Sequence, residues 1–165
     1  MSSGIGMARI KSLVNENTNR LNHKRPAFTK GTETVSLTEA QSGETIIVGP
    51  AAAGVAASTI FSLPAAKNGM CFKFVYVGGA ADAEQFQINT TADANYFIGG
   101  IFQTDPGGND GLVYHPDLNS NSRCFLKTPD AGTWAEVWCD GTNWFINGWS
   151  TSATDTGVVF SDQSL

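Results

Sequence analysis

The sequence predicts an all-β protein: an antiparallel β-sandwich or jelly-roll-like body behind an extended or partly helical N-terminal arm. Short runs of β-branched and aromatic residues recur along the chain, separated by turn residues roughly every 8–12 positions. The 18 glycines and ten phenylalanines favour short strands and turns over long helices. The 165 residues fit one ordinary domain, so a second full-size domain is not expected.

Charge divides the chain into two parts. Residues 1–31 hold six basic side chains and one acid, a balance of +5, whereas residues 32–165 hold four basic side chains and fourteen acids, a balance of −10. We therefore expect a basic arm over 1–31 and an acidic body over 32–165, with a C-terminal tail from about residue 150. The acidic body argues against a general nucleic-acid binder, because that function needs clustered cations.

The arm carries a narrow apolar stripe at helical spacing, and Pro26 ends any helix there. It is too short to bury a core of its own, so it either stays unordered or is ordered by a surface that it touches. The residues expected to contact such a surface are Ile5, Arg9, Ile10, Lys11, Leu13, Val14, Arg20, Leu21, Lys24, Arg25 and Phe28.

The body begins with a run at 34–38 that alternates between apolar and polar residues, and a second strand-like run follows at 44–48. A third run, 58–63, is closed by Pro64, and the small residues at 51–57 fit either a helix or a loop. Further strands are predicted at 70–77, 86–89, 94–98 (ended by Gly99-Gly100), 112–114, 123–127, 134–139, 142–147 and 158–160.

The clearest of these strands is 70–77. Phe72, Phe74 and Tyr76 lie on one face, and the other face is also largely apolar. This pattern is typical of a strand inside a sandwich or against a neighbouring subunit.

The strongest local signal is the hairpin over 134–147. Asp140-Gly141 separates its two β-rich runs, and Asp-Gly is a preferred type I′ turn. The Ser/Thr-rich residues that follow are expected to form the tail, with one short strand at 158–160.

The tryptophans in and after the hairpin allow two interpretations. They fill the core or a subunit interface, or they stack on sugar rings. The candidates for the core or interface are Phe72, Phe74, Tyr76, Trp138 and Trp144. The candidates for glycan contact are Trp149, Asn143 and Asn147.

Motifs for catalysis or metal binding are weak. The three cysteines lack metal-ligand spacing, His115 lies in a loop, and the oxygen-rich loop 105–111 lacks the EF-hand pattern. Asp82 and Glu84 share a strand face, but no cleft between them is inferred. We expect no enzyme activity, no metal and no cofactor. No apolar run approaches the roughly 20 residues that span a bilayer, and the N-terminus does not resemble a secretory signal.

Two segments resemble bacteriophage virion proteins. Residues 58–77, STIFSLPAAKNGMCFKFVYV, resemble their opening strands, and residues 137–148, VWCDGTNWFING, resemble their closing hairpin. The resemblance implies a compact β-sandwich or jelly roll that commonly trimerises. Fibre proteins of this kind carry the domain on a long shaft, whereas a small body behind a basic arm is similar to a head decoration, or cement, protein.

A decoration protein would be a non-enzymatic homotrimer on the capsid surface of the virion, assembled in the host cytoplasm. Its arm would clamp adjacent major capsid subunits, without nucleic acid or membrane as partner. The alternative is a receptor- or glycan-binding β-domain of a tail fibre or of the capsid surface.

Overall fold

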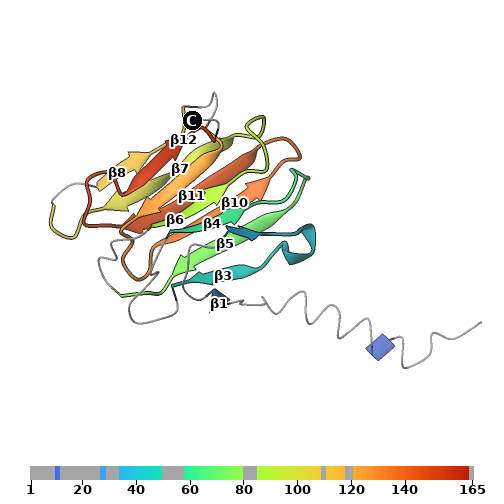
Figure 1. The fold of residues 1–165 in the computed structure, drawn as a ribbon, viewed down its shortest axis with the longest axis horizontal. Coiled ribbons are helices and arrows are strands. Elements are labelled where there is room, and N and C mark those ends of the chain that lie inside the picture. The colour runs from blue at the N-terminus through green and yellow to red at the C-terminus, as the bar shows by residue number, and fades with distance from the viewer. Residues whose placement is uncertain are drawn as a thin grey trace, which may run out of the picture.

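The structure, a computed structural model, describes residues 10–11, 27–28, 34–49, 58–79, 85–108, 111–117 and 121–163. Two β-sheets form the body, which confirms the predicted all-β sandwich (Figure 1). The larger sheet runs in the order β1 (Ala27–Phe28), β3 (Thr45–Val48), β5 (Cys71–Tyr76), β10 (Trp134–Cys139), β11 (Trp144–Thr151), β7 (Phe97–Thr104) and β8 (Gly111–Tyr114). The smaller sheet runs β12 (Val158–Ser161), β9 (Arg123–Lys127), β6 (Gln85–Asn89), β4 (Thr59–Ser62) and β2 (Thr34–Ser36), and the 3-10 helix η1 (Glu39–Gln41) follows β2.

Strand directions differ from the antiparallel arrangement that the sequence predicted, because both sheets are mixed. In the larger sheet β1, β3 and β5 are parallel, as are β7 and β11; in the smaller sheet β2, β4 and β6 are parallel. The first six strands alternate between the two sheets. Each crossing supplies the long connection that parallel neighbours need, which a hairpin cannot provide.

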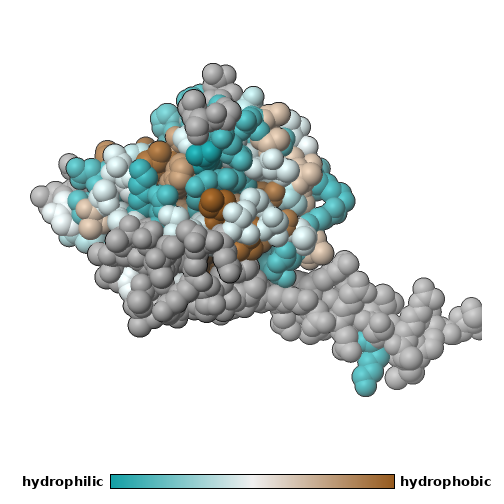
Figure 2. Space-filling model, viewed as in Figure 1, coloured by the Kyte–Doolittle hydropathy of each residue, from teal (hydrophilic) through white to brown (hydrophobic). Residues whose placement is uncertain are grey.

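The core lies between the sheets and is rich in aromatic rings. Phe61 of β4 packs on Phe74 of β5 with ring centres 5.1 Å apart, and Tyr76 stacks on Phe86 of β6 at 6.5 Å. Buried and partly exposed residues alternate along β5 and β9, as strands inside a sandwich require. On the face shown in Figure 2, the apolar side chains that reach the surface do so in small areas among polar ones.

The sequence predicted that Gly99-Gly100 would end a strand, but both glycines lie inside β7. A Cβ at Gly99 would lie 2.2 Å from the backbone oxygen of Ile146, and Gly99 has φ +119°. Gly99 therefore lets β7 approach β11 closely, and β7 continues to Thr104.

The predicted hairpin is confirmed, but its turn is longer than a two-residue type I′ turn. β10 pairs with β11 up to Cys139 and Trp144, which leaves residues 140–143 in the loop. Among the described residues Thr128 is the only non-glycine with a positive φ, so Asp140 does not adopt the type I′ geometry. Instead its carboxylate accepts the backbone N–H groups of Thr142 and Asn143, both at 2.8 Å.

The segment expected as a tail is part of the body. β11 extends to Thr151, and β12, close to the strand predicted at 158–160, pairs with β9. Beyond β12 the side chain of Gln163 donates to the backbone oxygens of Thr90 and Ser122, both at 2.9 Å. Hydrogen bonds thus hold the chain to the smaller sheet as far as residue 163.

The described part of the arm is short. Ile10 and Lys11 have helical backbone geometry and are exposed, and Phe28 belongs to β1, the edge strand of the larger sheet. The other expected arm contacts, and the segment 51–57, lie outside the described residues. Within the described residues no helix is long and apolar enough to cross a membrane.

Candidate functional site

The aromatic residues expected in the core or at a subunit interface divide between the two sides of the larger sheet. Phe72, Phe74, Tyr76 and Trp144 are buried in the core. Trp138 faces outward and is 40% exposed. Four of the five therefore hold the sandwich together and leave no surface for a neighbouring subunit.

Of the residues considered for glycan contact, two lie together. Trp149 is 43% exposed, and Asn147 lies two residues away on the same face of β11. Asn143 is in the turn, where its side-chain oxygen accepts the backbone N–H of Tyr96 at 3.1 Å. Asn143 therefore anchors the turn and does not join the other two.

The two exposed tryptophans, Trp138 and Trp149, lie on the outer face, by which we mean the side of the seven-stranded sheet turned away from the core. Residues that pair across neighbouring strands form three parallel rows on this face. The long row consists of Ile47, Val75, Trp134, Trp149, Phe102 and Val113, and it crosses six strands. The short row consists of Cys71, Trp138, Phe145 and Ile98. The middle row, between them, consists of Thr45, Lys73, Glu136, Asn147 and Gly100.

Each apolar row contains a pair of aromatic rings that contact each other across adjacent strands. Trp138 stacks on Phe145 with ring centres 5.7 Å apart and planes 13° from parallel. Phe102 lies against Trp149 at 5.0 Å, with planes inclined by 53°. Cross-strand aromatic pairs of this kind stabilise a sheet, and here each pair also leaves ring surface open to solvent.

Glycine and threonine neighbours fix the Phe102–Trp149 pair. A Cβ at Gly111 would lie 2.3 Å from the tip of the Phe102 ring, so this ring lies over the glycine of the adjacent strand. The indole N–H of Trp149 donates to the hydroxyl of Thr151 at 3.1 Å. These contacts thus fix the positions of both rings.

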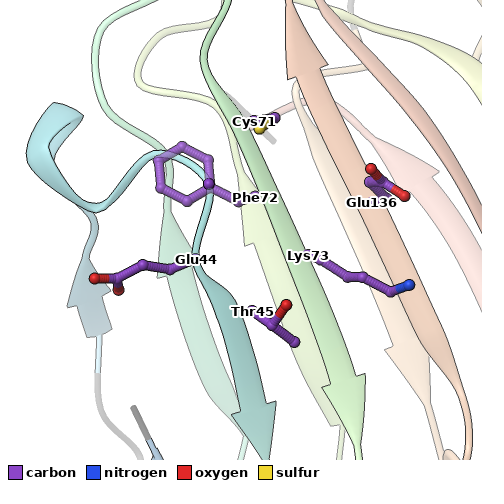
Figure 3. A pocket seen from close by; sticks show the side chains of 7 residues that line it. Glu44, Thr45, Cys71, Phe72, Lys73 and Glu136 are labelled. Atoms are coloured by element: carbon purple, nitrogen blue, oxygen red, sulfur yellow. The ribbon is translucent and has the colours of Figure 1, made fainter. Parts of the chain in front are cut away.

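The middle row is polar and electrically balanced. Lys73 and Glu136 are direct cross-strand partners. The Lys73 ammonium extends over β10 and lies 4.8 Å from the centre of the Trp134 ring (Figure 3). An open depression of about 370 Å³ lies at this end of the row, where Thr45, Lys73 and Glu136 line it from three adjacent strands (Figure 3).

Titratable groups elsewhere have structural environments. Burial raises the pKa of the Cys124 thiol far above its usual range, which keeps it protonated and unreactive. Backbone N–H groups of Asn143 and Thr142 lower the pKa of Asp140. All three cysteines are free thiols, and His115 is exposed in a loop.

Metal ligands do not converge in the part of the chain that the structure describes, where no group of three His, Cys, Asp or Glu side chains could hold an ion. In the loop 105–111, Asp105 accepts the backbone N–H of Gly107 at 2.8 Å. Asn109, Asp110, Asp82 and Glu84 lie outside the described residues.

Sequence reasoning singled out Trp149 and Asn147 but missed their neighbours Phe102, Trp134 and Glu136. Alternation along 134–138 places Trp134, Glu136 and Trp138 on one face, a signal that was present in the sequence. The position of Phe102 depends on the parallel pairing of β7 with β11, which carries no local signal. Comparisons with protein-family models, curated proteins and solved structures found no match to this chain.

Proposed function

We propose that this chain is a non-enzymatic virion structural protein of the head decoration type. Homotrimers coat the capsid surface, and the N-terminal arms clamp adjacent major capsid subunits. The resemblance of residues 58–77 and 137–148 to phage virion proteins supports this assignment.

The observation that carries the proposal is the way the arm joins the body. β1, which follows the basic segment, is the outermost strand of the larger sheet, and among the strands that the structure describes it pairs with β3 alone. The buried apolar residues described lie between Leu37 and Val158. The arm therefore starts at a sheet edge of a body whose described core is built without it, as attachment through the arm requires.

Three arms on one trimer would strengthen attachment by avidity. Each arm is short and binds weakly by itself, but once one arm is bound the others are held at high local concentration beside their sites. Clamping of this kind needs no chemical step, only geometry that lets the arms engage simultaneously.

Deletion of residues 1–25 tests the proposal. We expect the shortened chain to remain a folded trimer by circular dichroism and light scattering, and to lose binding to capsids that lack the protein. Unchanged capsid binding would refute the role of the arm, and a monomeric full-length chain would refute the trimer.

A pair of charge variants separates the arm from general electrostatics. Lys24→Gln with Arg25→Gln removes two positive charges from the arm, and Lys67→Gln with Lys127→Gln removes two from the body. We expect the first pair to weaken capsid binding and the second to leave it unchanged. Equal weakening would show that net charge, and not the arm, determines binding.

A further inference from the structure

We propose that the outer face of the seven-stranded sheet is a binding platform for a neutral polysaccharide chain. Sugar rings would lie against the exposed rings of Trp138 and Trp149, and the middle row would hydrogen-bond their hydroxyl groups. This function goes beyond capsid attachment and does not depend on it, because it uses the body and not the arm.

The pattern of the platform matches the chemistry of a sugar. A pyranose ring has an apolar C–H face and a rim of hydroxyl groups, so it is bound by aromatic surface with hydrogen-bonding groups beside it. On the outer face two apolar rows flank one polar row, and the rows are about 6.6 Å apart along each strand. A sugar chain that runs along the strands would cross all three rows and meet ring surface and hydroxyl partners in turn.

The polar groups of the middle row are of the kind that bind sugar hydroxyls. No side-chain hydrogen bond joins Thr45, Glu136 or Asn147 to any residue that the structure describes. The hydroxyl, carboxylate and amide groups thus offer both donors and acceptors. Lys73 offsets the charge of Glu136, and this balance favours a neutral ligand over a polyanion.

The aromatic part of the platform is already ordered. Trp149 is held by its hydrogen bond to Thr151, and Phe102 is held over Gly111. Trp138 is stacked on Phe145. Binding would therefore order few side chains, and less of the interaction free energy would be lost to entropy.

Other occupants fit this face less well. The rows cover roughly 24 by 13 Å, or about 300–500 Å² with side chains, estimated from standard strand spacings. A stable subunit interface of standard size buries about 800 Å² on each partner. A lipid surface would have to desolvate Lys73, Glu136 and Asn147 at the centre of the patch, which is costly.

Native affinity electrophoresis measures the interaction. The full-length protein is run in gels containing a soluble β-glucan, a mannan or a galactan, with anionic alginate as comparator. We expect at least one neutral polysaccharide to retard the protein more than alginate does. We expect Trp138→Ala and Trp149→Ala each to weaken that retardation by about tenfold or more, since exposed aromatic anchors dominate such contacts.

Leu112→Ala is the matched control. Leu112 is an exposed apolar residue of the same sheet, but it alternates with Val113 and points away from the outer face. We expect this variant to bind as the wild type does. Melting temperatures of all three variants check that each is folded.

Two results would overturn the proposal. The first is no retardation of the wild type by any neutral polysaccharide, and the second is retardation that both tryptophan variants retain. If the wild type is not retarded and the tryptophan variants lose self-association, or binding to phosphatidylcholine vesicles, the face is a protein or lipid contact. Because capsid binding is measured separately on arm variants, failure here leaves the decoration proposal standing, and the reverse also holds.

Discussion

Replacing Gly99 by alanine tests the close parallel contact between β7 and β11 on which the platform depends. The added Cβ would lie 2.2 Å from the Ile146 carbonyl oxygen, and this backbone atom cannot move unless the strands separate. The positive φ of +119° costs alanine about 1–2 kcal/mol. Strand separation adds about 1–3 kcal/mol for each buried backbone group left unpaired. We therefore expect the free energy of unfolding to fall by about 2–5 kcal/mol.

Gly43→Ala is the matched control, because Gly43 also has a positive φ, +88°, but a Cβ there would meet no atom within 4 Å. This variant should lose only the conformational term of about 1–2 kcal/mol. Urea unfolding gives the two free energies. Thermal unfolding gives the melting temperatures, which fall by about 2–4 °C per kcal/mol in a domain of this size. Equal losses in the two variants would refute the close approach of β7 to β11.

Three further predictions concern the core, the hairpin turn and the thiols. Phe74→Ala should reduce the free energy of unfolding by about 3–5 kcal/mol in urea titrations, because it removes a fully buried ring; a loss below about 1 kcal/mol would contradict the packing described. Asp140→Asn should lower the melting temperature at pH 7 and have a smaller effect at pH 3. The turn lowers the pKa of Asp140 in the folded state, so the ionised carboxylate stabilises the fold above the unfolded pKa of about 3.9. This stabilisation is lost as the pH falls through the folded pKa. An equal difference in melting temperature at both pH values would contradict this explanation. A thiol reagent at pH 8 should label the half-buried Cys71 before the buried Cys124, which should react only on unfolding; mass spectrometry of labelled peptides checks the order.

Most strands of the body could be predicted from the sequence because they have a local signal. Runs of β-branched and aromatic residues between turn residues located β3, β5 and β9 to within a residue or two, and the Asp-Gly pair located the hairpin. Strand direction has no such signal. Whether a strand joins the sheet beside it or crosses to the other one depends on packing between segments far apart in the chain. The parallel pairs were therefore missed.

Glycine was the residue type that misled the prediction most. Gly99 and Gly148 resemble strand ends, but both lie inside long strands. A Cβ at Gly148 would lie 2.4 Å from the backbone oxygen of Trp134, so here too glycine permits close approach of a neighbouring strand. A single sequence does not distinguish a glycine that a turn requires from one that lets a neighbouring strand approach closely.

The sequence could relate residues of the candidate site to each other only within a single strand. Trp149 and Asn147 share a face of β11 by alternation, and the sequence named both of them, with Asn143, as candidates for glycan contact. Phe102 comes beside Trp149 through parallel pairing, and Trp134 and Glu136 come beside them through the hairpin register. The same strands bury Phe72 and Trp144 on their inner side and present Lys73 and Phe145 on their outer side. The alternation that makes these strands fold thus also builds a surface on the other side, where aromatic and polar side chains are free of the packing demands of the core.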